Sequence, residues 1–450
     1  MATSTKNSPD QIESPIGFWR CWAISVGVMI GSGIFVLPAV LAPYGFISML
    51  GWLMTSIGVI GLAFVLGRLA RRTDNGVGGP YAYSRDAFGN LTGFLIGWGY
   101  WLSVTIAVTA IALAFAGYLS AILPALDDSN TVKNIIALVA IWTLTAVNIR
   151  GVSEAAWVQL ILTILKLVPL FVIILLGSSA GSVDTLPAFN PQDRPLHSAV
   201  AATALLTMWS FIGVEAAVIP AGNVRDAERT IPRAVVGAAV SVVAVYILVT
   251  LAVMMLVPAG TLANSEAPFI DAAKAMGPIG TGIIAFGALV ATAGSLNGSI
   301  LVMGQMPMAM ALDGLLPQRF ARTNEGHAPV FSLILSSIIA SVLIGLNSTG
   351  SLIDAFTFLI SISTLCVLAP YGVSALAELK HSLSNSRGWA LIALLTIAYV
   401  VLAASGSGFR ILAYGGVLMA VGLPLYFLFK RSAITSQTVM NQDDQNYETR

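Results

Sequence analysis

The chain contains 450 residues, of which 57% are hydrophobic and only 10% are charged, and its formal net charge is +1. Because an ordinary soluble domain carries about 25% charged residues, this composition excludes a soluble globular protein and predicts a polytopic membrane protein. The sequence also lacks a nucleotide-binding loop, a nucleophile elbow and clustered histidines. We therefore expect no enzyme activity, no pumping driven by ATP hydrolysis in this chain, and no cofactor, metal or nucleic-acid partner.

Twelve apolar runs come close to or reach the roughly 20 residues that a membrane-spanning helix needs. They run from Phe18 to Ala42, Phe46 to Leu69, Leu91 to Leu123, Val132 to Ile149, Ala155 to Leu176, Ser198 to Ala221, Ala234 to Val257, Ile279 to Met303, Val330 to Leu346, Leu352 to Leu376, Trp389 to Ala404 and Ile411 to Phe429. The first run begins too late and is too long for a cleaved signal peptide. The predicted fold class is thus an all-α polytopic membrane protein with twelve transmembrane helices.

Basic residues are concentrated in alternate loops, and such residues stay on the cytoplasmic side of a membrane. With an inside N-terminus, the cytoplasmic segments hold Arg68, Arg71, Arg72, Arg85, Arg150, Arg225, Arg229, Arg233, Arg319, Arg322, Lys380, Arg387, Lys430 and Arg431. The outer loops then hold only Lys133, Arg194, Lys274 and Arg410. Both termini are predicted to be cytoplasmic, with polar disordered tails at 1–15 and 432–450.

The first apolar run contains two glycines and a serine where a membrane helix should be most regular, in the segment Met29-Ile30-Gly31-Ser32-Gly33. Glycine is about 1 kcal/mol worse than alanine in a helix, and an opened turn in hydrocarbon leaves polar backbone groups without water. In an interrupted transporter helix these groups bind the cargo. Close packing of helices through small residues explains the same pattern, so both interpretations are open for this segment alone.

Lys166 lies in the middle of the fifth apolar run, too deep for its side chain to reach the membrane surface easily. A lysine at this depth must be paired or lose its proton. It could stabilise helix-end carbonyls without a further role, but we favour a function in coupling. Carbonyls freed by a break in the first helix would provide the partners that it needs.

The sixth apolar run contains a second candidate break, Trp209-Ser210-Phe211-Ile212-Gly213-Val214-Glu215, five spans after the first. Inverted five-span repeats place their first and sixth helices in matching positions, both discontinuous and facing each other. Two correlated breaks favour binding over packing, with Trp209 as a lid or wall of the site. Glu215 is costly inside a membrane and is either a proton carrier or a protonated structural acid.

These motifs resemble those of the amino acid, polyamine and organocation transporter superfamily, over nearly the whole chain. The resemblance rests on Gly31 to Phe35, on Gly78-Gly79-Pro80-Tyr81-Ala82-Tyr83 with Phe88-Gly89, on Trp209 to Glu215 with Asn223 and Ile231-Pro232-Arg233-Ala234, and on Asp313-Gly314-Leu315-Leu316-Pro317. Within the superfamily the chain looks most similar to bacterial arginine/agmatine, cadaverine and putrescine antiporters. It implies one transporter domain over 16–431, made of two inverted repeats at 16–177 and 195–377 and two peripheral helices at 388–430.

The resemblance also implies roles for individual residues. The positions of Ser32 and Gly33 meet the substrate carboxylate, and carbonyls at the positions of Met29, Trp209 and Ile212 meet its amino group. Trp209 closes over the substrate, and the position of Glu215 takes part in acid response. Related antiporters form homodimers, which makes a homodimer an expectation here as well.

Two departures weaken the interpretation as a transporter of cationic substrates. Ser299 stands where the arginine/agmatine antiporter has a stacking tryptophan, and Val108 aligns with a binding asparagine, so cation–π and polar contacts are lost. Lys166 instead resembles the lysine of proton-coupled amino acid transporters and L-type exchangers. We therefore predict a secondary active transporter of neutral amino acids, by exchange or proton coupling.

Two alternatives to this prediction are kept. The first is an arginine/agmatine or other basic amino acid or polyamine antiporter, and the second is a transport-inactive receptor or channel on the same fold. The predicted substrate-binding residues are Met29, Ile30, Gly31, Ser32, Gly33, Tyr100, Val108, Trp209, Ser210, Ile212 and Ser299, and the predicted coupling residues are Lys166 and Glu215. The expected location is the plasma membrane, in a bacterium the inner membrane.

Overall fold

The computed structural model describes residues 17–72, 79–126, 129–150, 155–215, 224, 226–326, 328–346 and 351–448; for 20, 24, 124, 155–164, 227–228 and 430–448 the description covers the backbone only. The elements are α-helices with short 3-10 helices between them. Gly78 and Asn223, which contribute to two of the motifs above, lie outside the described residues.

The N-terminal half contains α1 (Phe18–Met29), α2 (Ser32–Leu41), η1 (Ala42–Ile47), α3 (Ser48–Leu69), α4 (Pro80–Phe88), α5 (Asn90–Ile122), η2 (Pro124–Leu126), α6 (Asn130–Ile149), α7 (Ala155–Ala180) and η3 (Val183–Thr185). The C-terminal half contains α8 (Leu196–Met208), η4 (Trp209–Phe211), α9 (Ala227–Leu256), α10 (Ala259–Leu262), α11 (Pro268–Ala273), η7 (Lys274–Met276), α12 (Gly277–Leu312), η8 (Gln318–Phe320), α13 (Val330–Leu346), α14 (Leu352–Ser382), α15 (Arg387–Ser405) and α16 (Gly408–Glu448).

By length and composition, eight helical stretches of the described chain could cross a membrane. They are Ser32–Leu69, Asn90–Ile122, Asn130–Ile149, Arg229–Leu256, Pro268–Leu312, Leu352–Ser382, Arg387–Ser405 and Gly408–Phe429. Three further apolar helices are shorter, at Leu165–Ala180, Leu196–Phe211 and Val330–Leu346. Three features account for the difference from twelve: the first two apolar runs join where α2 continues through η1 into α3, the sixth run is interrupted after α8, and α13 has 17 residues. The fifth run corresponds to α7, which is 26 residues long, but side chains are described only from Leu165 onward. The chain is a multi-pass membrane protein, and its count of twelve spans stays a prediction.

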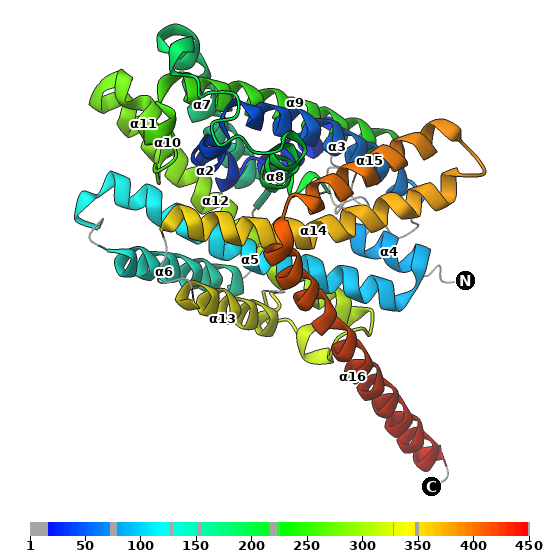
Figure 1. The fold of residues 1–450 in the computed structure, drawn as a ribbon. Helices are drawn as coiled ribbons and strands as arrows, with labels where there is room; N and C mark the ends of the chain where they lie inside the picture. The colour runs from blue at the N-terminus through cyan, green and yellow to red at the C-terminus, as the bar shows by residue number, and fades with distance from the viewer. Residues whose placement is uncertain are drawn as a thin grey trace, which may run out of the picture.

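The helices form one elongated bundle in which most axes run in roughly the same direction (Figure 1). α5 lies near its centre and packs along α12 and α14, while α3 packs on α8 and α9, and α1 on α9 and α7. α16 crosses the bundle obliquely and continues to Glu448. The stretch from 432 that we predicted to be a disordered tail is therefore helical up to that residue.

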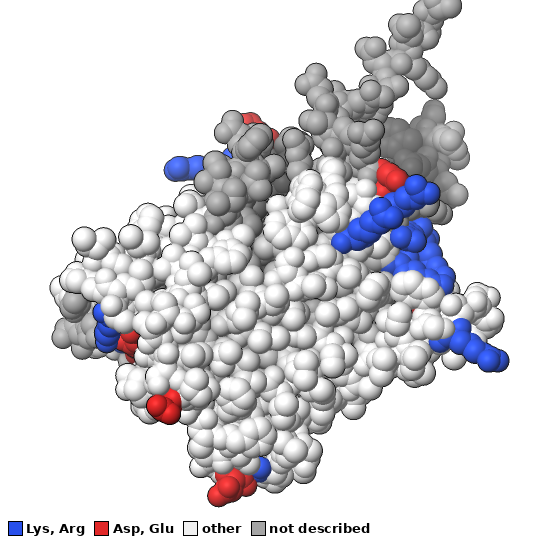
Figure 2. All heavy atoms as spheres, turned by 90° about the horizontal axis from the view of Figure 1, so that it is seen from above, with Lys and Arg blue, Asp and Glu red and all other residues white. Residues whose placement is uncertain are grey.

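The side wall of the bundle carries almost no charge, as a surface in contact with lipid requires (Figure 2). On the face drawn there, most basic side chains gather at one end of the molecule. We call this the basic end. It contains the C-terminus of α3, the short helix α4, and the turn between α14 and α15.

Candidate functional site

The first predicted break is present, and it separates α1 from α2 by two residues. Ile30 has φ −74° and ψ 89°, and Gly31 is extended with φ −121° and ψ −157°. Because the first amides of a helix have no acceptor within it, the N–H groups of Ser32 and Gly33 at the start of α2 are free as far as the described residues go. Both residues are buried. The break thus creates the positive end of a helix inside the bundle.

The carbonyls that the break frees at the end of α1 receive donors from two other helices. The ammonium of Lys166 on α7 donates to the Gly27 carbonyl at 3.3 Å, and the hydroxyl of Tyr246 on α9 donates to the Met29 carbonyl at 2.7 Å. Lys166 is 1% exposed. The buried lysine therefore lies on the first break, as its depth in the sequence suggested, and its role in coupling stays a prediction.

The second break follows the end of α8. After the 3-10 turn η4, Ile212 is extended with φ −61° and ψ 126°, and Gly213 has φ +104°. Residues with a side chain rarely adopt a positive φ of this kind, so the glycine permits the change of direction. The amides of this break are occupied: Ile212 donates to the Trp209 carbonyl at 3.3 Å, and Gly213 donates to Glu215 at 3.2 Å.

The two breaks are in direct contact. A Cβ atom on Gly33 would lie 2.7 Å from the indole Cδ1 of Trp209 and 2.8 Å from the Oγ of Ser210. A Cβ on Gly213 would lie 2.4 Å from Val28. The indole therefore rests against the free N-terminus of α2. A side chain at position 33 could therefore not be accommodated without moving the indole.

Two hydroxyl groups, those of Tyr246 and Ser210, lie where the two breaks meet. Tyr246 bridges the breaks, since its hydroxyl lies 2.7 Å from the Met29 carbonyl and 3.2 Å from the Ser210 carbonyl. The Ser210 hydroxyl is buried and finds no hydrogen-bond partner among the described residues. The junction thus offers an unused donor and acceptor beside the free amides of α2.

Glu215 accepts hydrogen bonds from two tyrosines on different helices. Tyr100 on α5 and Tyr371 on α14 each donate to its carboxylate at 2.7 Å, and the carboxylate is 1% exposed. Tyr100, one of the predicted substrate-binding residues, is thus directed at Glu215. The sequence analysis missed Tyr371 and Tyr246, because a tyrosine in an apolar span gives no signal of its partner.

The two predicted selectivity positions lie on α5 and α12. Val108 is fully buried, and Ser299 is half-buried. Ser295, one helical turn before Ser299, lies against the first break, since a Cβ on Gly31 would come within 2.5 Å of its Oγ. Residues four apart share a helix face, so Ser299 continues the surface that α12 presents to the break. Among the described residues there is no group of three or more metal-ligating side chains.

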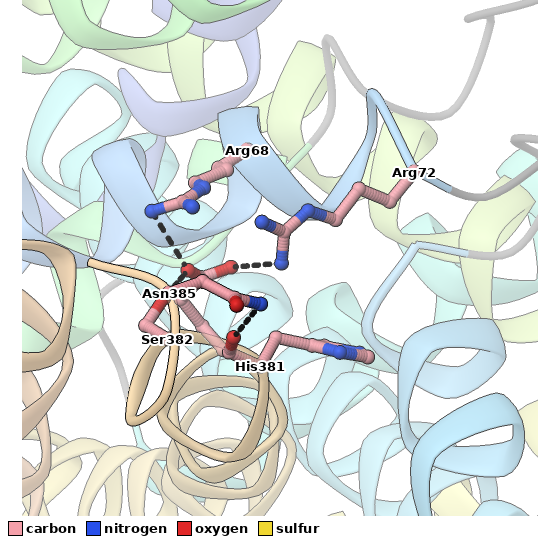
Figure 3. Close-up of polar contacts among 6 residues, drawn as sticks. Arg68, Arg72, His381, Ser382 and Asn385 are labelled. Carbon is pink, nitrogen blue, oxygen red and sulfur yellow. Dashed lines mark hydrogen bonds and ion pairs between the residues drawn. The ribbon is translucent and has the colours of Figure 1, made fainter.

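Ion pairs close the basic end of the bundle. Arg68 and Arg72, from neighbouring turns at the end of α3, converge on the carboxylate of Glu378 at 3.1 and 3.5 Å (Figure 3). Glu378 is fully buried and also accepts a short hydrogen bond from Ser382. These contacts connect α3 to the end of α14.

A second set of contacts connects α4 to the loop after α12. Arg85 forms a short ion pair with Asp313, and the Tyr81 hydroxyl donates to the same carboxylate at 2.7 Å. Helix α4 lies outside the candidate spans. Hydrogen bonding to Asp313 raises the pKa of Arg85, and burial together with the Asp313 carboxylate raises the pKa of Tyr81. Both groups therefore keep their protons at physiological pH.

Two discontinuous helices that meet inside an apolar bundle are the architecture of secondary transporters, and comparison with known proteins identifies the family. The family described as "Amino acid permease" matches residues 16–431. A Bacillus subtilis protein named "Putative arginine/ornithine antiporter" is 32% identical over 425 residues, covering 86% of this chain and 90% of its own. The arginine/ornithine antiporter of Pseudomonas aeruginosa is 29% identical, with coverage of 90% and 88%. The cadaverine/lysine antiporter of Escherichia coli is 31% identical, with coverage of 83% and 85%.

The chain belongs to the amino acid permease family, within the amino acid, polyamine and organocation superfamily. It is an amino acid transporter and not an enzyme. The resemblance seen in the sequence motifs is thereby confirmed.

Proposed function

We propose that this protein exchanges basic amino acids across the membrane by alternating access. The proposal includes twelve spans in two inverted repeats, cytoplasmic termini and a place in the bacterial plasma membrane. Support comes from the relatives, whose names describe arginine/ornithine and cadaverine/lysine antiporters. They favour basic substrates over the neutral amino acids that the departures at Val108 and Ser299 suggested.

The proposed recognition of the substrate backbone rests on the free N-terminus of α2. The amides of Ser32 and Gly33 are suited to an anionic carboxylate, since a helix N-terminus combines N–H donors with a positive dipole end. The Ile212 carbonyl at the second break is suited to the α-ammonium group, whereas the Met29 carbonyl already accepts a hydrogen bond from Tyr246. Trp209 would lie over the bound substrate, since its indole already contacts Gly33.

Glu215 is the group to which we assign the preference for a cationic side chain. Among the described residues it is the buried carboxylate next to the two breaks, whereas Glu378 lies at the basic end. Tyr100 and Tyr371 hold its two oxygens and so fix its position. An arginine or ornithine side chain would replace the tyrosine contacts by hydrogen bonds in which the donor as well as the acceptor is charged.

Counterflow in proteoliposomes tests this function directly. Vesicles that contain unlabelled arginine should accumulate external labelled arginine, and external ornithine or lysine should compete while leucine and alanine should not. Competition by leucine but not by ornithine would favour a transporter of neutral amino acids. A receptor or a channel would show no accumulation driven by trapped substrate.

A pair of tryptophan variants connects this activity to the proposed site. Trp209→Ala removes the indole that rests on α2 and should abolish counterflow. Trp142→Ala removes an indole that is 40% exposed on the side wall and should leave counterflow intact. Equal activity of the two variants would contradict the assigned place of the site.

A further inference from the structure

An open pocket of about 900 Å³ lies at the basic end of the bundle, away from the two breaks. Four helices contribute to it: α1 through Phe18, α3 through Phe64 and the arginines at its end, α9 through its first turns, and α15 through Trp389. The full lining is Phe18, Phe64, Arg68, Arg71, Arg72, Pro232, Arg233, Val236, Gly237 and Trp389. None of the proposed transport residues belongs to this set.

The lining of this pocket combines two chemistries that rarely occur together. Its walls are aromatic and aliphatic, and four guanidinium groups surround them. Arg68 also lies over the Trp389 ring, with its guanidinium carbon 4.4 Å from the ring centroid, and Phe64 meets the edge of the same ring. A small soluble anion would use the arginines but would leave the apolar walls exposed. A lipid uses both.

The positive charge of the pocket is largely uncompensated by the described residues. None of the residues that line it is acidic. Glu378 reaches Arg68 and Arg72 from α14, as Figure 3 shows, so one carboxylate serves two guanidinium groups. Arg71 and Arg233 are exposed and have no acidic partner within the described chain. An anion in the pocket would therefore meet two free guanidinium groups.

The position of the pocket places it at the boundary between hydrocarbon and water. Arg71 and Arg72 directly follow the apolar stretch that ends at Leu69, and Arg233 lies just before the apolar part of α9. Basic pockets between membrane helices on the cytoplasmic side bind anionic lipid headgroups, and arginine recognises phosphate with two parallel hydrogen bonds. Trp389 lies near the start of the candidate span Arg387–Ser405, and tryptophan is enriched at the ends of membrane spans.

We propose that this pocket binds an anionic phospholipid of the inner leaflet. Its phosphate lies between Arg71 and Arg233, and one acyl chain lies against Phe64, Val236 and Trp389. Because α1, α3, α9 and α15 all contribute, the bound lipid holds four helices together at this end. The proposal is independent of which amino acid is transported.

Lipid retention by the purified full-length protein tests the proposal. The pocket variant Arg71→Gln/Arg233→Gln is compared with Arg319→Gln/Arg322→Gln, which removes the same charge from exposed arginines outside the pocket. Native mass spectrometry from micelles with phosphatidylcholine and phosphatidylglycerol counts the retained lipids. We expect phosphatidylglycerol retention to fall about fivefold for each pocket arginine removed, on the basis of the energy of one basic residue at an anionic surface. The control variant should match the parent.

Two further measurements distinguish a lipid phosphate from a soluble phosphate ion. Val236→Trp fills the apolar part without changing charge, and it should also lose phosphatidylglycerol while retaining as much phosphatidylcholine as the parent. Phosphatidylglycerol should raise the melting temperature of the parent and the control variant but not of the pocket variant, and inorganic phosphate should not. Equal retention by pocket and control variants would overturn the proposal. An equal rise in melting temperature with phosphate would also overturn it, because the pocket would then be a site for a soluble anion.

Discussion

The two breaks that form the centre of this transporter are built in opposite ways. At the first, donors from other helices occupy the freed carbonyls, with Lys166 on Gly27 and Tyr246 on Met29, and the amides of α2 stay free. At the second, the amides are occupied, since Gly213 donates to Glu215. The first break therefore leaves backbone donors open, whereas at the second break these donors are used.

This difference supports the proposed recognition of a zwitterion at one buried junction. The carboxylate of an amino acid needs donors, for which we propose the amides of α2, and its ammonium needs an acceptor, for which we propose the Ile212 carbonyl. The backbone requirements also differ. The first break uses an extended conformation that any residue adopts, whereas the second depends on the positive φ of Gly213.

Replacing Gly213 should have the largest effect. Gly213→Ala forces a side chain into a left-handed conformation, at about 1–2 kcal/mol, and drives its Cβ to within 2.4 Å of Val28, for about 1–3 kcal/mol more. We expect counterflow to be lost and the melting temperature to fall. Gly345→Ala, whose Cβ would meet nothing within 4 Å, is the matched control. Wild-type exchange by Gly213→Ala would remove the second break from the mechanism.

Lys166→Met tests the side-chain support of the first break. The substitution keeps the length of the side chain but leaves the buried Gly27 carbonyl without its donor, at a cost of about 1–3 kcal/mol. Counterflow should fall about tenfold, while the protein stays folded. Lys133→Met removes a buried lysine that pairs with Glu266 at 2.5 Å, away from the breaks. The Lys133→Met control should be less stable but should keep its exchange rate. A similar loss of exchange in both variants would show that Lys166 has only a structural role.

Glu215→Gln separates recognition of the substrate side chain from recognition of its backbone. Glutamine fills the same space and still accepts from a tyrosine, but it removes the charge-assisted contact, which is about 1.5–3 kcal/mol. Arginine affinity should fall about tenfold or more, while competition by leucine should not weaken. Glu378→Gln makes the same change in the buried carboxylate at the basic end and should leave the preference unchanged. If arginine and leucine responded equally to Glu215→Gln, the proposed selectivity would be wrong.

Much of this arrangement could be predicted from the sequence, because breaks and buried charges violate the rules of a membrane helix. Gly31, Gly213 and Lys166 stand out for that reason, and the structure places all three at the junction. The partners could not be predicted. Tyr246 and Tyr371 lie in ordinary apolar spans, and only the fold brings them to a freed carbonyl and to Glu215.

The substrate class was the weaker part of the sequence analysis. Loss of a stacking side chain at Ser299 and of an amide at Val108 suggested a neutral substrate, yet relatives that match most of this chain are named for basic substrates. Two side chains are a small part of a site to whose charge we propose that Glu215 contributes, and the contacts of its carboxylate come from α5, α14 and the second break, which are far apart in the sequence.

Gly31→Ala should have the smallest effect on exchange. Recovery of exchange by a second substitution would show that the first break is limited by packing. Gly31 already has an extended backbone that alanine adopts without strain. Its added Cβ comes too close to one atom, the Oγ of Ser295 at 2.5 Å, while the Ser295 Cβ lies at 3.4 Å, so a loss of about 1 kcal/mol, or about fivefold in exchange, is expected.

The double variant Gly31→Ala/Ser295→Ala should restore the parent's exchange, because the clash disappears with the hydroxyl. Gly213→Ala/Val28→Ala removes a clash of similar closeness but keeps the strained backbone, so it should recover only part of the loss. Measuring both double-mutant cycles by counterflow distinguishes a break limited by packing from one limited by conformation. Full recovery in both pairs, or in neither, would show that the two breaks depend on glycine for the same reason.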